Sequence, residues 1–524
     1  MTASQPAPPA PKRVAVVGGG LAGMAVALAL ARHGQHVDLF EARRHLGGRA
    51  ASFLDPKTDR LIDLCQHVSM GCCTNLADFC ARTGVADCFD RCRVLHIYPP
   101  NGKPVRLCAW RWLPAPAHLL PALLKLDYLT LADRLGIART LAHLAKTGAT
   151  DAPPGPSVHD WLRAQGQSSR SIHGFWQVIL VSALGESLDR VSLTAARKVF
   201  VDGFLAARHG YELMIPAITL RELFAERVAT ALARCGVHVH SGAAVGRLEG
   251  GAAGVIGVRL ADGRRHQADH TVLAVPWQHL GGLLPPGVVA DTPILTGPAR
   301  PGQNQNGSPA TGPCAAHFSP REAVDTLEPS PITGVHLWFD RPIMELSCAA
   351  LVGRTSHWVF NRNRPAGRSD EKSDEYYYQV VISASRQLLS WKSADILRRV
   401  TAELRDTWTA AHNARLLRGH VVTQRQAVFS PLPGLDRIRP SQRTRLPGLV
   451  LCGDWTATGW PATMEGAVRS GYMAAEAVLE DIGSPATVRV PDLPRGIVAR
   501  LLFGKGGDAV GRGAPAPARG WPKP

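Results

Sequence analysis

A glycine-rich turn near the start of the chain has the residue types and spacing of an anion-binding loop. The letters GGGLAG, residues 18–23, fit the pattern G-x-G-x-x-G and lie between an apolar β-branched run and an alanine-rich helical segment. Gly18 permits the tight turn, Gly20 lets the backbone approach a pyrophosphate, and Gly23 lets helix and strand pack closely. Unpaired N–H groups at the helix start then bind the anion. The turn therefore predicts a dinucleotide site.

Two charged residues complete such a site. Glu41 ends the next predicted strand, where an acidic residue accepts hydrogen bonds from a ribose. Arg49 follows a pair of glycines, and an arginine held beside the phosphate site neutralises the pyrophosphate charge. Ala42 and Gly48 lie in the same stretch and belong to the predicted cofactor site. A glycine turn without a ligand is the alternative.

The stretch from residue 61 to residue 80, LIDLCQHVSMGCCTNLADFC, is rich in cysteine. It holds four of the chain's eleven cysteines, namely Cys65, Cys72, Cys73 and Cys80. Their spacing matches no C-x-x-C pair and no common zinc or iron–sulfur pattern, so no metal site is predicted. Cys73 and Cys80 are seven residues apart and would share a helix face as small buried hydrophobes. A redox pair of the two adjacent cysteines would need a strained bond.

The letters EARRHLGGRA, residues 41–50, resemble the flavin-containing amine oxidase and phytoene desaturase superfamily. The resemblance implies FAD as the cofactor. It also implies that Gly453 and Asp454, at the end of a strand, face the ribityl and pyrophosphate region. Met464 and Glu465 would begin a helix whose N-terminal amides stabilise the electron-rich reduced ring. The backbone of Val245 would contact the adenine.

Within this superfamily, three segments resemble the hydroxysqualene dehydroxylases, also described as squalene-associated FAD-dependent desaturases. They are QHVSMGCCTNLADFCARTG, SPITGVHLWFDRPI and LCGDWTATGWPATMEGAVRSG. The resemblance covers about residues 13–480 except 292–330. It implies reductive removal of the hydroxyl of hydroxysqualene, a C30 isoprenoid, to give squalene in hopanoid biosynthesis. A hydride from reduced flavin would quench the allylic cation. Many members have glycine where this chain has Cys65.

The resemblance places Gln66 and His67 near the flavin as the candidate catalytic residues. We expect His67 to be the proton donor, because the ordinary pKa of histidine allows protonation near neutrality. A histidine that only orients the flavin or the loop is the alternative. Gln66 would hydrogen-bond either the substrate hydroxyl or the flavin. The apolar helical segment 110–147 could line a tunnel for the substrate.

Three other functions remain open. A carotenoid-type desaturase would have the same fold and substrate class but would move hydride from the isoprenoid to FAD. An amine oxidase would need an aromatic pair and a lysine near the flavin, which the sequence does not identify. A prenyl-lipid carrier on the same fold would have lost the flavin, and the retained Glu41, Arg49 and Asp454 argue against it.

The helices and strands expected to position these residues indicate an α/β protein. A Rossmann-like FAD-binding domain of the amine oxidase and phytoene desaturase type would be interleaved with a substrate domain of mixed sheet and helices. The expected FAD-binding parts are residues 13–90, 236–291 and 446–482. The expected substrate parts are the mainly helical region 91–235 and the sheet region 331–445. The expected remaining segments are a flexible leader at 1–12, a mobile insertion without packed elements at 292–330, and a tail at 483–524.

Composition and charge bear on partners and location. Lysine and arginine outnumber the acids by 59 to 42, giving a formal net charge of +17. We expect peripheral contact with an acidic membrane through the apolar segment 110–147 or the tail, and no nucleic acid. The first residues lack the apolar core of a secretory signal, so we expect a cytoplasmic protein, peripheral on the inner face of the cytoplasmic membrane. Prenyl synthases of the squalene pathway would be its functional partners.

Overall fold

The computed structural model describes residues 10–55, 60–100, 103–146, 155–285, 287–288, 294–296, 317–363 and 375–503. A five-stranded parallel sheet lies at the centre of the predicted cofactor domain. Its strands, in spatial order, are β10 (Val237–Ser241), β2 (His36–Glu41), β1 (Arg13–Val17), β14 (His270–Leu273) and β22 (Leu449–Leu451). The four residues of β1 after Arg13 are buried, as expected for a parallel strand covered on both faces. Three separate stretches of sequence thus form one sheet.

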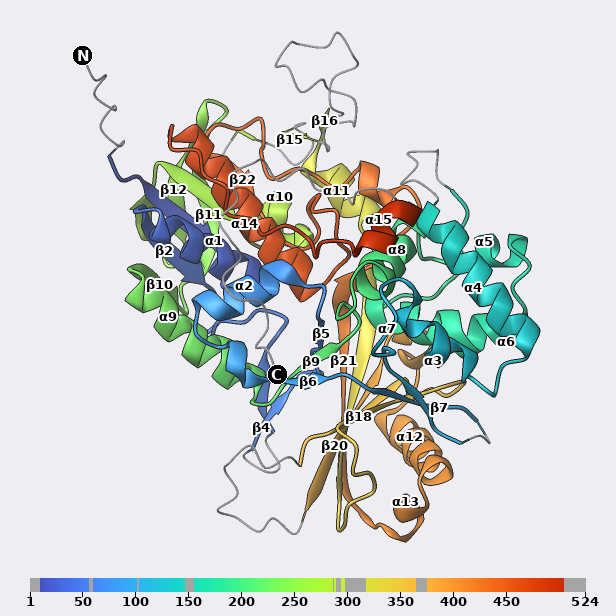
Figure 1. Ribbon diagram of the computed structural model, residues 1–524. Helices are drawn as coiled ribbons and strands as arrows, with labels where there is room; N and C mark the ends of the chain where they lie inside the picture. The colour runs from blue at the N-terminus through green and yellow to red at the C-terminus, as the bar shows by residue number, and fades with distance from the viewer. Residues whose placement is uncertain are drawn as a thin grey trace.

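Two long helices pack beside each other against this sheet (Figure 1). The first is α1 (Leu21–Arg32), whose alanine and leucine residues favour helix and bury ten of its twelve positions. The second is α14 (Met464–Asp481). Their axes come close at Gly471, where a Cβ would lie 2.4 Å from the Ala22 carbonyl oxygen. A glycine is therefore required for this helix pair.

A seven-stranded sheet forms the lower part of the molecule in the view of Figure 1. Its order is β21 (Leu416–Phe429), β17 (Pro329–Phe339), β20 (Tyr376–Ile382), β19 (Trp358–Asn361), β18 (Cys348–Leu351), β7 (Leu95–Tyr98) and β8 (Val105–Leu107). Along β17, Val335 and Leu337 pack into a core with α12 (Ser393–Thr407). The alternate residues Gly334 and His336 occupy the opposite face, because side chains alternate along a strand.

A mainly helical region packs against the β7, β8 and β18 end of the seven-stranded sheet. Its α-helices are α3 (Leu120–Leu124), α4 (Leu131–Lys146), α5 (Val158–Ala164), α6 (Ser169–Ser171), α7 (Gln177–Leu184) and α8 (Leu193–Arg197). The next helix, α9 (Ala229–Arg234), lies instead beside β10 of the parallel sheet (Figure 1). Three π-helical segments interrupt them, η3 (Ile172–Trp176), η4 (Lys198–Leu205) and η5 (Arg221–Val228). Aromatic side chains of η3 and η4 stack in the core, with the Phe175 and Phe200 ring centroids 5.9 Å apart.

Short sheets and helices connect these parts. The remaining strands are β3 (Ser52–Asp55), β4 (Arg60–Asp63), β5 (Ser69–Met70), β6 (Phe89–Cys92), β9 (Leu213–Pro216), β11 (Val245–Gly251), β12 (Gly254–Leu260) and β13 (Arg265–Gln267). The remaining α-helices outside residues 292–330 are α2 (Thr74–Arg82), α10 (Leu280–Leu283), α13 (Thr409–Asn413) and α15 (Ile497–Phe503).

The expectation that 292–330 holds no packed element is wrong for part of that segment. Two short strands, β15 (Leu295–Thr296) and β16 (His317–Phe318), pair with each other. Helix α11 (Pro320–Thr326) follows, and β17 begins at Pro329. The Pro, Gly, Asn and Ser content hid a local helix signal, since Ser319 and Glu322 form a capping box at the start of α11. Residues 292–293 and 297–316 lie outside the described part of the chain.

Both expected terminal segments are described only in part. Residues 1–9 of the leader and 504–524 of the tail lie outside the described ranges. The described start of the tail packs on the domain, with Val488 and Val490 buried. None of the helices in the described ranges has the length and apolar character needed to cross a membrane.

Candidate cofactor and active site

The glycine turn leaves room for a ligand at one position. A Cβ on Gly18, whose φ is +108°, would lie 2.5 Å from the Ala274 carbonyl oxygen. A Cβ on Gly23 would lie 1.9 Å from the Gly18 carbonyl oxygen, so packing within the protein excludes any side chain there. At Gly20 the nearest atom is the Cα of Gly48, 4.0 Å away. The open space at Gly20 is thus where a pyrophosphate fits against the backbone.

Glu41, the predicted ribose ligand, supports the glycine turn. One carboxylate oxygen accepts the backbone N–H of Gly19 at 2.7 Å, and the other accepts that of Arg43 at 2.8 Å. Each oxygen keeps a lone pair with which a ribose hydroxyl could be bound. Ala42 is exposed beside it. The Glu41 carboxylate therefore fixes the loop on which the cofactor would lie.

The predicted adenine contact begins a strand near the Glu41 end of β2. Val245 is the first residue of β11 and is partly buried. Two residues before it, the N–H of Ala243 donates to the Glu41 carbonyl at 2.9 Å. The backbone leading into β11 is thereby tied to the carboxyl end of β2.

Arg49 and Asp454 form an ion pair, although 405 residues separate them in sequence. The guanidinium Nη2 lies 2.5 Å from a carboxylate oxygen of Asp454. The Asp454 side chain is 4% exposed and the Arg49 side chain 36% exposed. A second guanidinium nitrogen donates to the Ala427 carbonyl at 3.1 Å. Sequence reasoning assigned both charges to the cofactor but did not predict that they would contact each other.

The segment that carries Asp454 is held at the end of β22. Gly453 has a φ of +140°, which disfavours any residue with a side chain. Its N–H donates to the hydroxyl of Ser470 on α14 at 2.8 Å. The aspartate is therefore positioned by the strand, the glycine and the helix together.

The start of α14 presents backbone amides, but the Glu465 side chain is occupied elsewhere. Thr463 caps the helix through its side chain. The Glu465 carboxylate is fully buried and accepts the N–H of Leu76 at 2.8 Å and the amide of Asn75 at 2.9 Å, both on α2. Burial raises the pKa of Glu465. The Glu465 carboxylate thus joins α14 to α2, and a flavin contact through the backbone amides at Met464 and Glu465 stays a prediction.

Gln66, which is buried, and His67, which is partly buried, lie in a turn stabilised by hydrogen bonds between neighbouring residues. His67 Nδ1 lies 3.0 Å from the Cys65 carbonyl, and the Gln66 amide donates to the His67 carbonyl at 3.0 Å. Gln66 Oε1 is buried and has no hydrogen-bond partner among the described residues. An unsatisfied buried acceptor of this kind is expected where a bound group supplies the donor.

The expectation that His67 has an ordinary pKa is wrong. Burial lowers the pKa of His67 and is the largest influence on it. The Cys65 carbonyl and Asp63 oppose this shift, and the positive charge of Arg49, the smallest of the four influences, adds to it. The imidazole is therefore neutral at neutral pH. With Nδ1–H donating to the Cys65 carbonyl, Nε2 carries the free lone pair and accepts a proton rather than giving one.

Cys65 fits its position without strain. Among the described residues other than glycine, only Ala384 has a positive φ, so Cys65 does not need a glycine backbone. Burial raises the pKa of its thiol to about 12, and the thiol is therefore protonated. The described cysteines are free thiols, and no cluster of His, Cys, Asp and Glu in the described ranges is suited to hold a metal ion.

The substrate-side sheet adds polar groups that sequence reasoning missed. A Cβ on Gly334 of β17 would lie 2.9 Å from the Leu64 carbonyl, so this strand packs directly on the turn before His67. Gln379 of β20 is fully buried, and its Oε1 has no partner among the described residues. The same is true of His336 Nε2 on β17. A glutamine within the apolar strand YYYQVVI was the available signal for the first of these.

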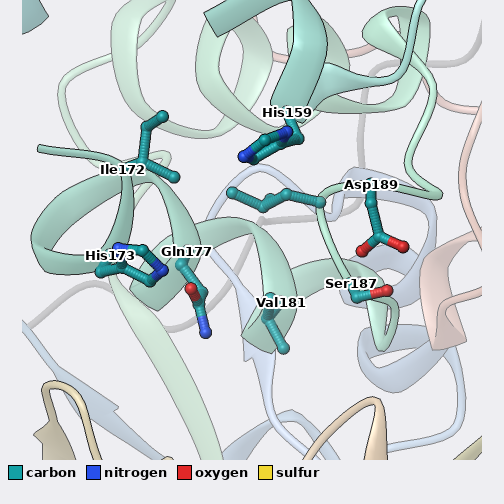
Figure 2. A pocket seen from close by; sticks show the side chains of 8 residues that line it. His159, Ile172, His173, Gln177, Val181, Ser187 and Asp189 are labelled. Atoms are coloured by element: carbon teal, nitrogen blue, oxygen red, sulfur yellow. The ribbon is translucent and has the colours of Figure 1, made fainter. Parts of the chain in front are cut away.

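A separate pocket of about 300 Å³ opens in the helical region (Figure 2). Its wall is contributed by α5, η3, α7 and the loop after α7, and it is lined by His159, Ile172, His173, Gln177, Val181, Ser187, Leu188 and Asp189. None of the predicted site residues is among them. The pocket is therefore distinct from the turn that carries Gln66 and His67.

Comparison with known proteins assigns the family. The model of the family described as "Flavin containing amine oxidoreductase" matches residues 21–479. The chain belongs to this family. Its cofactor is accordingly FAD. The open space at Gly20 and the ion pair of Arg49 with Asp454 are consistent with this cofactor. When bound, FAD accepts or donates a hydride at the flavin ring.

Similar proteins include carotenoid desaturases. The chain is 25% identical over 499 residues to the 15-cis-phytoene desaturase of Glycine max, covering 91% of this chain and 81% of that protein. It is 24% identical over 505 residues to the zeta-carotene desaturase of a Synechocystis strain, covering 89% and 97%. Among solved structures, the cyclohexylamine oxidase of Brevibacterium oxydans has a TM-score of 0.63 at 16% identity, covering 90% of this chain and 100% of that one. The solved structure confirms the predicted fold class.

Proposed function

We propose that this FAD-dependent oxidoreductase acts on a long-chain isoprenoid, and that its reaction is the reductive removal of the hydroxyl of hydroxysqualene to give squalene. Similarity to two carotenoid desaturases across about nine-tenths of the chain supports an isoprenoid substrate. Prenyl synthases that supply hydroxysqualene would be the functional partners.

The observation that carries the choice of reaction is the contact between two segments that resemble hydroxysqualene dehydroxylases. The QHV segment and the strand HLWFDRPI are more than 260 residues apart in sequence, and Gly334 packs against Leu64 at their junction. Gln66 Oε1 on the first segment is buried and has no partner among the described residues. The same holds for Oε1 of Gln379 on β20, which lies opposite His336 of the second segment. Such acceptors would bind and orient a substrate hydroxyl.

In this reaction the carbon–oxygen bond breaks and the hydroxyl leaves as water after gaining a proton. Reduced FAD, when bound, would supply the hydride that replaces it. Because the His67 imidazole is neutral, we assign His67 an orienting role through its bond to the Cys65 carbonyl. The proton would then come from solvent or from a group other than His67.

A carotenoid-type desaturase is the second candidate, and a specific observation favours it. Desaturation transfers a hydride from the isoprenoid to FAD, loses a proton to a base, and forms a carbon–carbon double bond. A neutral imidazole with a free Nε2 lone pair can be that base. The relatives named above are desaturases by name.

Product analysis separates the two candidates. The FAD-loaded protein, reduced anaerobically with dithionite, is incubated with hydroxysqualene, and the extracted lipid is identified by mass spectrometry. Squalene is the expected product. In a parallel arm the oxidised protein receives phytoene and a quinone as electron acceptor. Desaturated phytoene, with hydroxysqualene unchanged, would overturn the first candidate in favour of the second. A protein that takes up no FAD and converts neither lipid would leave a lipid carrier.

A further inference from the structure

We propose that one face of the helical region docks on an anionic lipid bilayer. Within the described ranges, 17 large hydrophobic side chains are exposed, and ten of them lie on residues 110–135 and 497–502. These residues belong to a loop before α3 and to α3, α4 and α15, where α4 contacts both other helices. Figure 1 shows the three helices on the same half of the molecule. We call this surface the docking face.

The loop contributes two tryptophans beside cations. Trp112 is 76% exposed and Trp110 is 48% exposed. The Arg111 guanidinium lies 4.8 Å from the Trp112 ring centroid, and the Lys125 ammonium lies 5.9 Å from that of Trp110. Arg208 fixes the loop by donating to the Trp110 carbonyl at 2.8 Å. Tryptophan with a nearby cation suits the headgroup layer, because the ring is amphipathic and the charge meets phosphate.

Helix α4 contributes an apolar stripe with basic edges. Leu131 and Leu135 are 59% and 55% exposed, and the exposed Ala142 continues the same helix face two turns later. Arg134 and Arg139 lie on either side of this stripe by helical geometry. A helix of this kind lies flat in a bilayer interface, with its leucines below the headgroups.

Helix α15 is held at the same face by ion pairs of the preceding tail. Ile497 and Leu501, one turn apart, are 74% and 81% exposed. Upstream, the carboxylate of Asp492 binds Lys198 of η4 at 2.8 Å and also pairs with Arg469 of α14. The tail is therefore anchored to both domains before it presents its apolar side chains.

Charge decides which partner fits the docking face. Its apolar groups are bordered by arginine and lysine, and the whole chain carries a formal net charge of +17. Two copies joined through this face would place like charges opposite each other, which disfavours a symmetric dimer. A bilayer with acidic headgroups instead matches the cations at the edge and accepts the tryptophans and leucines.

Flotation of vesicles with the full-length, FAD-loaded protein tests the proposal. The probes are vesicles of phosphatidylcholine alone and of phosphatidylcholine mixed equally with phosphatidylglycerol. The docking variant combines Leu131→Gln and Leu135→Gln. The matched control combines Leu54→Gln and Trp391→Gln, which are 52% and 43% exposed outside the docking face. Flavin absorbance verifies that each variant is folded.

The wild type and the control are expected to float with the mixed vesicles, and more weakly at high salt or without phosphatidylglycerol. Since each leucine would bury apolar surface in the bilayer, the docking variant should bind at least about tenfold more weakly. A second variant, Ile497→Gln with Leu501→Gln, should weaken binding likewise without removing Asp492. The proposal would be overturned if the docking variant bound vesicles as well as the control, or if the wild type bound no vesicles. It would also be overturned if the wild type bound both kinds of vesicle equally, or if the docking variant lost self-association but not vesicle binding. Flotation requires no turnover, so its outcome is independent of the proposed reaction.

Discussion

The substitution Gly20→Ala separates cofactor binding from folding. Gly20 has a φ of −74° and a ψ of 178°, a conformation that alanine adopts readily. A Cβ at this position would meet no protein atom closer than the Gly48 Cα at 4.0 Å. The protein alone therefore accommodates the methyl group, whereas a pyrophosphate lying against this backbone does not.

Two small effects on the apoprotein nearly cancel. Replacing glycine where the backbone is compatible with alanine stabilises by about 0.4–1 kcal/mol through the unfolded chain. Gly20 is also the N-cap of α1, and an alanine N-cap costs up to about 1 kcal/mol. The free energy of unfolding should thus change by less than about 1 kcal/mol. Overpacking against bound FAD costs about 1–3 kcal/mol, which weakens FAD binding roughly 5- to 150-fold.

Two measurements test this prediction. Urea titration of the apoprotein, followed by tryptophan fluorescence, gives the free energy of unfolding, and quenching of flavin fluorescence gives the FAD dissociation constant. Gly23→Ala is the contrast, because its Cβ would lie 1.9 Å from the Gly18 carbonyl oxygen and should cost the apoprotein about 3 kcal/mol. If Gly20→Ala binds FAD as tightly as the wild type, the pyrophosphate does not lie at Gly20.

Three further outcomes are expected. Arg49→Ala leaves the buried Asp454 carboxylate without its ion pair, so FAD affinity should fall about tenfold or more. Flavin fluorescence titration measures this affinity. If both Arg49→Ala and Asp454→Asn bound FAD as tightly as the wild type, the assignment of this ion pair to the cofactor site would be wrong. His67→Ala should retain FAD and most of the turnover with hydroxysqualene, since the imidazole is neutral; loss of turnover with FAD still bound would restore the donor role. Burial lowers the pKa of His336 to about 3 and of His118 to about 4, so the unfolded chain binds more protons below pH 6.5. The free energy of unfolding should therefore decrease as the pH is lowered, by about 2 kcal/mol per histidine between pH 6.5 and 5. Urea titration of His336→Gln should show a smaller decrease over the same pH range.

Local signals in the sequence predicted the cofactor part of the fold. The spacing of Gly18, Gly20 and Gly23 between a strand and a helix is a short-range pattern, and the structure places it in a βαβ unit of a parallel sheet. The segment 292–330 was harder, because its composition outweighed the capping box at Ser319. Composition averages over a segment, whereas a helix start depends on two side chains.

The details of the site required contacts between residues far apart in sequence. Gln379 is one such case, because a single polar residue in a strand does not show which turn it will meet. Glu465 is another, since its position at a helix start does not show that its carboxylate accepts the N–H of Leu76 on α2.

The sequence by itself determined which glycines shape a dinucleotide-binding turn, because backbone geometry restricts those positions locally, and its resemblance to a flavoprotein superfamily implied FAD. Only the tertiary structure decided which charged side chains meet and in which direction the pKa of His67 shifts. Arg49 meets Asp454 through folding of distant segments, and burial of His67 makes its imidazole neutral. Charge states depend on burial and on neighbouring charges, and both arise when the two sheets and the helical region pack together.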